Sequence, residues 1–155
     1  EEKQSLNKSM KQNNVGYKEA EKIDEFVDAI RIRVDVFIKE QKCEPGWEPD
    51  EDDKVSRHFI AIVDDKIVST ARVREPAKRE FKIERMATIK EYRGKHISIG
   101  LLNYMINKIT KLKPKRIWIQ SQVRSQKFYE KYGFKAISKP YDLYGIPHID
   151  MEYSL

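Results

Sequence analysis

The segment from Glu84 to Leu102 carries the pattern with the clearest chemical meaning. A strand-like apolar run up to Thr88 leads into a short basic turn with Arg93 and Lys95, and an amphipathic helix follows at once. The first backbone N–H groups of a helix have no partner inside it, and the positive end of the helix dipole lies there. Such a junction binds anions, phosphates above all. The alternative is an ordinary strand-to-helix connection with solvated basic residues.

A second group of charged residues is the acidic cluster between Glu48 and Asp53. We interpret it as a solvated surface loop, and the alternative is a surface that attracts a cationic amine. The cluster lacks the spaced oxygen ligands and the glycine turn of a calcium loop, so no metal site is predicted. The one cysteine, Cys43, has no paired histidine in its sequence context and is expected to be an ordinary thiol.

Hydrophobic periodicity predicts the first long helix. Between Ile23 and Lys39 the apolar residues recur at three- and four-residue spacing, which is typical of one apolar helix face. We expect Arg31, Arg33 and Asp35 to point away from that face. A loop, with at most one helical turn, is expected to follow from 41 to 55.

Short runs of β-branched and aromatic residues between turn signals predict the strands. A meander comes first and a helical crossover later, which gives an α/β mixed sheet with helices on both faces. A ligand at the carboxyl end of the strand before the crossover would lie where open α/β sheets hold one. The expected strands are 15–19, 59–63, 67–73, 81–88, 116–120, 134–137 and 149–153, and the further helices are 97–112 and 125–131.

The composition describes a soluble globular protein. The 155 residues are 39% hydrophobic and 36% charged, so we expect one domain over 15–155, with the polar stretch 1–14 as a flexible lead-in. No apolar run approaches the ~20 residues of a membrane span, and a single cysteine indicates a cytoplasmic protein without disulfides. The net charge of +6 is dispersed instead of forming a stripe with aromatics, so a nucleic-acid partner is not expected.

Taken together, the segments resemble the GNAT superfamily of acyl-CoA-dependent N-acetyltransferases, and the ElaA-type branch in particular. The resemblance covers roughly 15–153 and lies in three separated stretches, namely 33–41 with 57–61, 84–102, and 120–134 with 144–151. It implies a GNAT-like acyl-CoA N-acyltransferase fold, acetyl-CoA as the acyl donor, and direct attack by a primary amine in a ternary complex. The amine could belong to a small molecule or a protein. Dimers are common among similar proteins, so a homodimer is one expected assembly.

By this resemblance, the backbone of the strand end pairs with the pantetheine arm of the cofactor, and a backbone N–H near Met86 polarises the thioester carbonyl. Backbone N–H groups of the basic turn hold the pyrophosphate. The implied cofactor-binding residues are Met86, Ala87, Thr88, Arg93, Gly94, Lys95, His96, Ile97 and Ser98.

The turn departs from the family pattern at one position. The family has small residues at the positions of His96 and Ser98. Ser98 is small enough for a phosphate to approach the backbone, but the His96 ring stands where glycine would allow that approach. Either the ring points away from the phosphates or the turn is rebuilt around it. A catalytically weak acyl-CoA-binding or regulatory module is therefore the alternative to an enzyme.

The resemblance implies roles for two further side chains near the cofactor. Tyr129 matches a tyrosine that protonates the leaving thiolate, and an ordinary phenol pKa of ~10 suits a proton donor at neutral pH. The alternative is a packing tyrosine beside Phe128. Gln122 falls where a cofactor-contacting asparagine is common, and otherwise it is a polar residue at a strand end.

Three residues are candidates for the general base. Glu84 ranks first, because several family members carry a glutamate on this strand that acts through water, and an ion pair with Arg72 or Arg74 is the alternative. His148 and His58 follow, since imidazole titrates near physiological pH. A single histidine is more often a hydrogen-bonded structural residue. The sequence does not identify the acceptor amine.

Overall fold

A computed structural model describes residues 14–155, so the predicted lead-in lies outside the described residues except for its last position. The chain divides into two compact units. The first unit extends to Arg72 and includes Arg85–Ile106, and the second comprises Val73–Glu84 and Asn107–Leu155. The expectation of a single domain over 15–155 stays a prediction.

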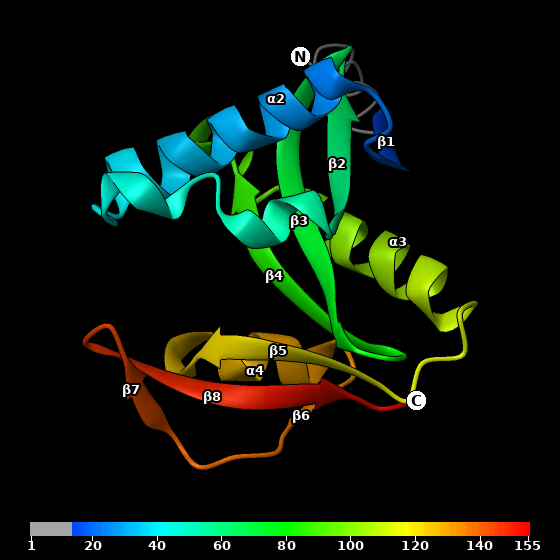
Figure 1. The fold of residues 1–155 in the computed structure, drawn as a ribbon, viewed down its shortest axis with the longest axis vertical. Helices are drawn as coiled ribbons and strands as arrows, with labels where there is room; N and C mark the ends of the chain where they lie inside the picture. Colours follow the sequence, from blue (N-terminus) through cyan, green and yellow to red (C-terminus); the bar gives the residue numbers. More distant parts are fainter. Residues whose placement is uncertain (1–13) are drawn as a thin grey trace, which may run out of the picture. The chain divides into compact units, whose positions relative to one another are not determined.

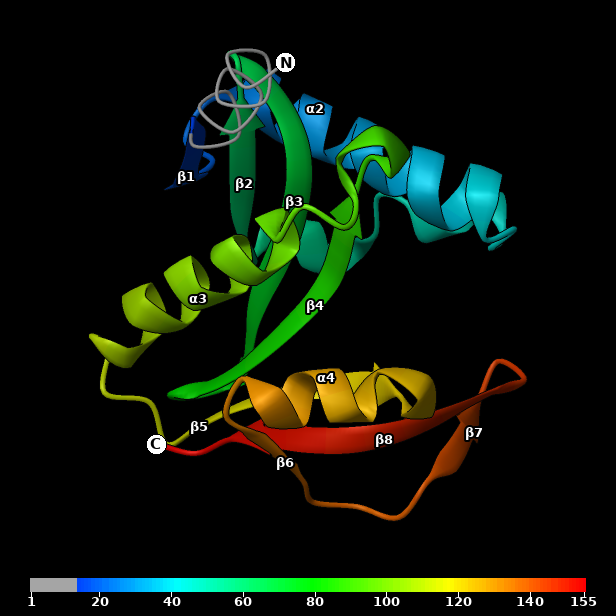
Figure 2. The same cartoon turned by 180° about the vertical axis from the view of Figure 1, so that it is seen from behind.

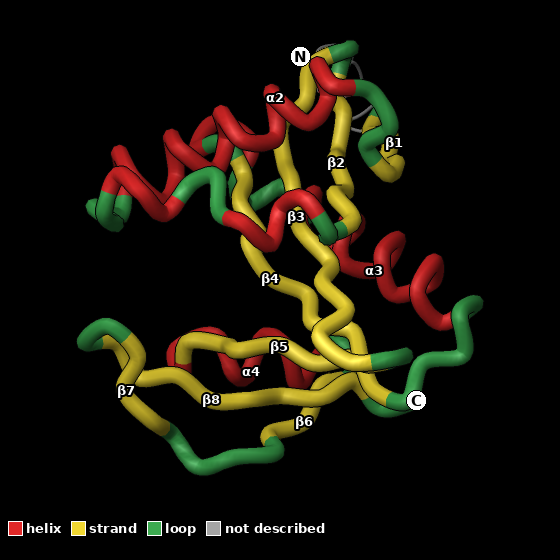
Figure 3. Tube along the Cα trace, viewed as in Figure 1, coloured by secondary structure: helices red, strands yellow, loops and turns green. Residues whose placement is uncertain are grey.

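In the part of the chain that the structure describes, eight strands form one mixed sheet in the order β1-β2-β3-β4-β5-β8-β6, with β7 paired to β8 (Figures 1 and 3). The ladder between β4 and β5 is parallel, whereas β1 with β2 and β8 with β5, β6 and β7 are antiparallel. The predicted α/β fold class is confirmed. The strands are β1 Val15–Glu19, β2 Arg57–Val63, β3 Lys66–Ala77, β4 Glu80–Thr88, β5 Arg116–Gln122, β6 Phe134–Ala136, β7 Tyr141–Leu143 and β8 Ile146–Tyr153.

Within residues 14–155, three α-helices accompany the sheet: α2 Ile23–Arg33, α3 Ile97–Thr110 and α4 Gln126–Lys131. Helix α2 continues as a π-helix, η1 Val34–Glu40. In the first unit, α2 and α3 cover opposite faces of β2 and β3 (Figures 1 and 2). In the second unit, α4 packs beside β6. Across residues 14–155, no helix combines the length and apolar character needed to cross a membrane.

The core of the first unit lies between α2, the sheet and α3. Helix α3 approaches β1 closely at Gly100, where a Cβ atom would lie 1.9 Å from the phenol oxygen of Tyr17. A larger residue is therefore excluded there unless the tyrosine moves. The buried apolar residues include Ala29, Ile32, Val36, Phe59, Ile60, Ala61, Val68, Ala87, Leu101, Leu102 and Met105.

The prediction for the apolar face of α2 was wrong at Ile23, Val27 and Arg33, although Arg31 and Asp35 are exposed as expected. Ile23 is 77% exposed and Val27 is 40% exposed, whereas Arg33, expected to face away, is completely buried. Periodicity counted only apolar residues, and it missed that a guanidinium can be buried when carboxylates neutralise it. The helix therefore packs through Ala29, Ile32, Arg33 and Val36.

The second unit contains one strand that the sequence pattern did not predict. Strand β7 pairs with β8 through a tight turn in which Tyr144 and Gly145 have φ angles of 54° and 78°. Two consecutive left-handed residues are the geometry of a type I′ hairpin. Strand β7 has three residues with Asp142 at its centre, and that is too short for an alternating pattern to stand out.

Candidate functional site

The basic turn between β4 and α3 is built from left-handed residues. After the 3₁₀ turn η4 Lys90–Tyr92, the φ angles of Gly94 and His96 are 73° and 61°. The Gly100 N–H then donates to the carbonyl of His96 at 3.1 Å as α3 begins. Helix geometry leaves the amides of the first turn, from Ile97 onward, without a partner inside the helix.

The conformation of His96 explains why a glycine suits its position. A left-handed backbone costs a residue with a Cβ about 1–2 kcal/mol, and glycine avoids this cost. The imidazole is exposed to solvent instead of being packed in the first unit. The sequence left open whether the His96 ring points outward or the turn is rebuilt around it. In the structure the backbone of the turn has a glycine-like conformation at His96, and the ring is exposed.

The side chain of Arg93 closes the turn. Its Nε donates to the carbonyl of Thr88 at 2.9 Å, and its Nη2 bonds the Glu40 carboxylate at 2.9 Å. The bond from Arg93 also lowers the pKa of Glu40. The Lys95 ammonium lies 5.3 Å from the centre of the Tyr92 ring. Arg93 therefore joins the end of β4 to η1, and Lys95 adds a positive charge to the exposed turn.

The end of β4 is anchored to β3 by Ser69. Its hydroxyl donates to the carbonyl of Ala87 at 3.1 Å and lies 2.8 Å from the Thr88 hydroxyl. Ala87 itself packs with Ile32 and Val36. These contacts hold the predicted pantetheine-binding backbone on both sides, from the sheet and from the helix.

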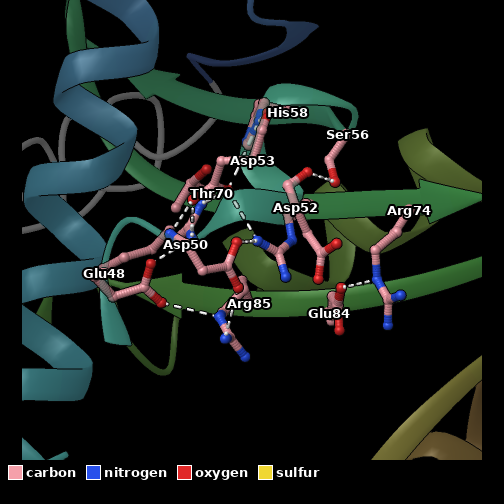
Figure 4. Close-up of polar contacts among 12 residues, drawn as sticks. Glu48, Asp50, Asp52, Asp53, Ser56, His58, Thr70, Arg74, Glu84 and Arg85 are labelled. Carbon is pink, nitrogen blue, oxygen red and sulfur yellow. Dashed lines mark hydrogen bonds and ion pairs between the residues drawn. The ribbon is translucent and has the colours of Figure 1, made fainter. Parts of the chain in front are cut away.

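Carboxylates of the acidic loop form a largely buried cluster of ion pairs with arginines of α2, β3 and β4 (Figure 4). We call it the arginine–carboxylate cluster: Arg33, Arg72, Arg85, Glu48, Asp50 and Asp53. Arg33 forks onto Asp53 at 2.8 and 3.0 Å and also bonds Glu48. Arg72 bonds Asp50 at 2.5 Å and Asp53 at 2.9 Å. Three guanidinium charges thus face three carboxylates.

The cluster corrects the interpretation of the acidic loop as a solvated surface or an attractor of amines. Burial alone would raise the pKa of Asp53, but hydrogen bonds from Arg33, the Asp50 backbone and Arg72 hold it well below the usual range. One of these arginines gave a sequence signal, because Arg72 interrupts an apolar strand, whereas the spacing of Arg33 placed it off the apolar face of its helix. A charged residue within a core pattern is rarely buried unless it is paired, so Arg72 indicated a counter-charge without identifying it.

His58, one of the candidate bases, has a structural role. Its Nε2 donates to the Asp53 carbonyl at 3.0 Å, and its ring contacts Phe26 edge-on at 4.8 Å. Burial lowers the pKa of His58. The His58 ring is therefore held in its neutral form, buried and bonded to the backbone of the acidic loop, and it stabilises that loop.

This environment predicts an acid-sensitive fold. An unfolded histidine binds its proton near pH 6.5, whereas folded His58 binds it only at lower pH, so its contribution is complete above about pH 6.5 and declines as the pH falls. We expect the free energy of unfolding to decrease from pH 7 to pH 5, and less steeply in His58→Gln. Urea unfolding at a series of pH values measures this slope. The half-exposed His148→Gln is the matched control, and an unchanged slope in His58→Gln contradicts the prediction.

In the second unit, Glu84 lies between two cations. Its Oε1 bonds Arg74 Nε at 2.8 Å, and its Oε2 lies 3.2 Å from Lys82 Nζ. Lys82 also donates to Gln120 at 2.6 Å. The ion pair weighed from the sequence is thus present with Arg74, whereas Arg72 belongs to the arginine–carboxylate cluster. A carboxylate has several acceptor sites, so one that contacts two cations can still accept a hydrogen bond from water.

The other candidates of the second unit lie at the end of β5 and on α4. Gln122 is the last residue of β5 and stands opposite His148 in the ladder with β8. Nδ1 of His148 donates to the Ile146 carbonyl at 2.8 Å, which leaves Nε2 as the basic nitrogen of the neutral ring. Tyr129 contacts Phe134 edge-on at 5.7 Å, and burial raises its pKa.

The structure therefore divides the predicted residues between the two units. The pantetheine-binding and phosphate-binding residues, 86–88 and 93–98, belong to the first unit. The second unit holds Glu84, Gln122, Tyr129 and His148, and its ladder places Gln122 beside His148. Ser69 and Trp47 were not singled out from the sequence, since their contacts depend on the folding of distant segments.

A mixed sheet in which a basic turn opens the crossover helix is the architecture of acyl-CoA N-acyltransferases. The crystal structure of an acyl-CoA N-acyltransferase from Pseudomonas aeruginosa has a TM-score of 0.80 to this chain, with 26% identity, and covers 90% of this chain and 98% of that one. The model of the acetyltransferase (GNAT) domain matches residues 31–155, and the chain belongs to this family.

Two curated relatives support the branch. Protein ElaA of Escherichia coli is 28% identical over 134 residues, which cover 83% of this chain and 87% of ElaA. The crystal structure of ElaA has a TM-score of 0.80, with 90% of this chain and 99% of that one covered at 23% identity. The uncharacterized protein YyaT of Bacillus subtilis is 33% identical over 132 residues, or 80% of this chain and 85% of YyaT. The predicted ElaA-like branch is confirmed.

Proposed function

We propose that this protein transfers the acetyl group of acetyl-CoA to a primary amine, of a small molecule or a protein. One observation carries the proposal: the exposed basic turn after β4, with left-handed Gly94 and His96, leads directly into α3, and helix geometry leaves the first amides of α3 without a partner inside the helix. Backbone amides at a helix start are suited to a diphosphate, and Lys95 adds charge there. The family membership supports an acyl-CoA donor.

The reaction needs few groups from the protein. The neutral amine attacks the thioester carbonyl, the carbon–sulfur bond breaks, the amine loses a proton and the thiolate gains one. In our proposal the strand end Met86–Thr88 aligns the donor and polarises its carbonyl. Tyr129 protonates the thiolate, and Glu84, through water, or His148 removes the proton of the amine. Gln122 contacts the cofactor.

Acetyl-CoA is expected to stabilise the protein against heat. At a ligand concentration about 100 times Kd the stabilisation is about 2.7 kcal/mol, which corresponds to roughly 5–10 °C in Tm for a chain of this size. Differential scanning fluorimetry measures the shift, and release of free thiol over a panel of amines measures turnover. The absence of a shift at millimolar acetyl-CoA contradicts the proposal.

The matched control is Ser98→Glu, at the second residue of α3. A carboxylate at a helix start favours the helix itself, but it repels a diphosphate at the same place. The variant without ligand should melt at the wild-type temperature or above it, and acetyl-CoA should shift it little. Binding in the wild type without turnover on any amine would favour an acyl-CoA-binding module instead.

A further inference from the structure

Arg85 has an unusual backbone conformation directly before the proposed pantetheine-binding strand end. It lies within β4 with a φ of 55°, directly before Met86–Thr88. A left-handed residue that is not glycine costs about 1–2 kcal/mol, and within a strand it matches the first residue of a G1-type β-bulge, where glycine is usual. Such a conformation persists only where the surroundings hold it.

Three residues of the segment between α2 and β2, namely Trp47, Glu48 and Asp50, contact the Arg85 side chain. The guanidinium lies 4.9 Å from the centre of the Trp47 ring. Its Nε is 3.0 Å from Glu48 Oε1, and its Nη2 is 3.1 Å from Asp50 Oδ2 (Figure 4). One aromatic face and two carboxylates therefore fix the side chain of the left-handed residue.

The loop groups are themselves held in place. Glu48 is buried against Arg33, and Asp50 bonds the buried Arg72 at 2.5 Å. These arginines belong to α2 and β3, the elements between which β4 ends. The carboxylates that contact Arg85 are thus themselves bonded to arginines of α2 and β3.

The geometry points to a positioning role: we propose that Trp47, Glu48 and Asp50 act through Arg85 to hold the backbone of Met86–Thr88 in the conformation that receives the pantetheine arm. On one side Ser69 ties Ala87 and Thr88 to β3, and on the other Arg85 sets the direction in which the strand leaves the bulge. The loop thereby determines affinity for the donor without touching the phosphate turn. This inference rests on the proposed function.

The test compares two ligands in one set of variants. Acetyl-CoA uses both the phosphate turn and the strand end, whereas the nucleotide half of coenzyme A, phosphoadenosine diphosphate, uses the turn only. Arg85→Ala removes the anchor and keeps a Cβ that disfavours the left-handed backbone. We expect its Kd for acetyl-CoA, measured by calorimetry, to rise about tenfold, as for the loss of one or two backbone hydrogen bonds. The Kd for the nucleotide half should stay within about twofold of wild type, since the turn is unchanged.

Two further variants separate backbone conformation from anchoring. Arg85→Gly can adopt the left-handed conformation freely but has nothing to hold it, so its Kd for acetyl-CoA should lie between those of wild type and Arg85→Ala. Trp47→Leu removes the ring and leaves every charge of the cluster paired. It should shift the acetyl-CoA affinity in the same direction by a smaller factor, and it keeps the inference testable if Arg85→Ala fails to fold.

Arg57→Ala is the control for a simple loss of stability. Arg57 forks onto Glu19 at 2.8 and 2.7 Å in the same unit, away from β4. It should lower the unfolding free energy and leave both Kd values unchanged. Equal acetyl-CoA affinity in wild type, Arg85→Ala and Trp47→Leu overturns the inference, as does a parallel loss of both ligands. A wild type that binds neither ligand rejects the proposed function itself.

Discussion

Replacing Arg33 by methionine is expected to lower the free energy of unfolding by about 3–5 kcal/mol, the cost of breaking a buried ion pair from one side. Arg33 is completely buried, and it alone bonds both Asp53 and Glu48. Methionine has similar length and fills the space, so the loss reports the missing guanidinium, with Asp53 then paired only with Arg72 and Glu48 only with Arg85. Urea denaturation at neutral pH measures it.

The pH dependence of this loss provides a second check. Arg33 helps to hold the pKa of Asp53 well below its ordinary value, so the stability it contributes is complete above about pH 4 and is lost as the pH falls further. In Arg33→Met the carboxyl can take up a proton more readily. The difference in unfolding free energy between wild type and variant should therefore be largest at neutral pH and narrow on acidification below about pH 4.

Arg31→Met is the matched control for Arg33→Met. Its side chain is 76% exposed and its contact with Asp28 is 3.7 Å, so the substitution should change stability by less than about 0.5 kcal/mol. Arg33→Lys keeps the charge but not the fork and should give an intermediate loss. If Arg33→Met is as stable as Arg31→Met, the cluster does not hold the loop.

Tyr129→Phe is expected to lower kcat about a hundredfold or more, the range for loss of a proton donor in the transition state. Burial raises the pKa of Tyr129, so the phenol keeps its proton at neutral pH and can give it to the departing thiolate. In the proposed mechanism the hydroxyl acts only as the thiolate forms, so KM for acetyl-CoA should change little. Steady-state kinetics on the best amine of the panel separates the two parameters.

Tyr132→Phe is the control on the neighbouring aromatic. Tyr132 contacts Phe128 at 5.2 Å, as Tyr129 does, and follows the same short helix. Its kcat should stay within about twofold of wild type, because no proton transfer is assigned to it. A Tyr129→Phe variant with wild-type kcat would return Tyr129 to the packing role and leave the thiolate to be protonated by solvent.

The strands and helices follow closely from local patterns. The tight turn at Asp64 and Asp65, both with left-handed φ angles, joins two alternating runs, and α3 has the apolar spacing expected of it. These features are encoded within a few residues, because turn geometry and side-chain periodicity are local properties. The basic turn before α3 could be predicted from the sequence because it, too, depends only on neighbouring residues.

The arginine–carboxylate cluster could not be predicted in this way. Arg33 meets Asp53 across 20 residues of sequence, and Arg85 meets Asp50 across 35. Whether a charge points to water or into the core depends on which distant segment brings a counter-charge to it. Periodicity placed Arg33 on the outside and Ile23 on the inside of α2, and both assignments were wrong.

By itself the sequence determined the order of the elements, the mixed sheet, the crossover with its phosphate-type turn and, by resemblance, the family. Only the tertiary structure decided that the acidic loop is a buried set of ion pairs and that His58 stabilises it. It also decided that Arg85, in a left-handed conformation directly before the proposed cofactor strand, contacts the carboxylates of the acidic loop. The physical reason is that backbone conformation follows from neighbouring residues, whereas the burial of a charge depends on partners that only folding brings together.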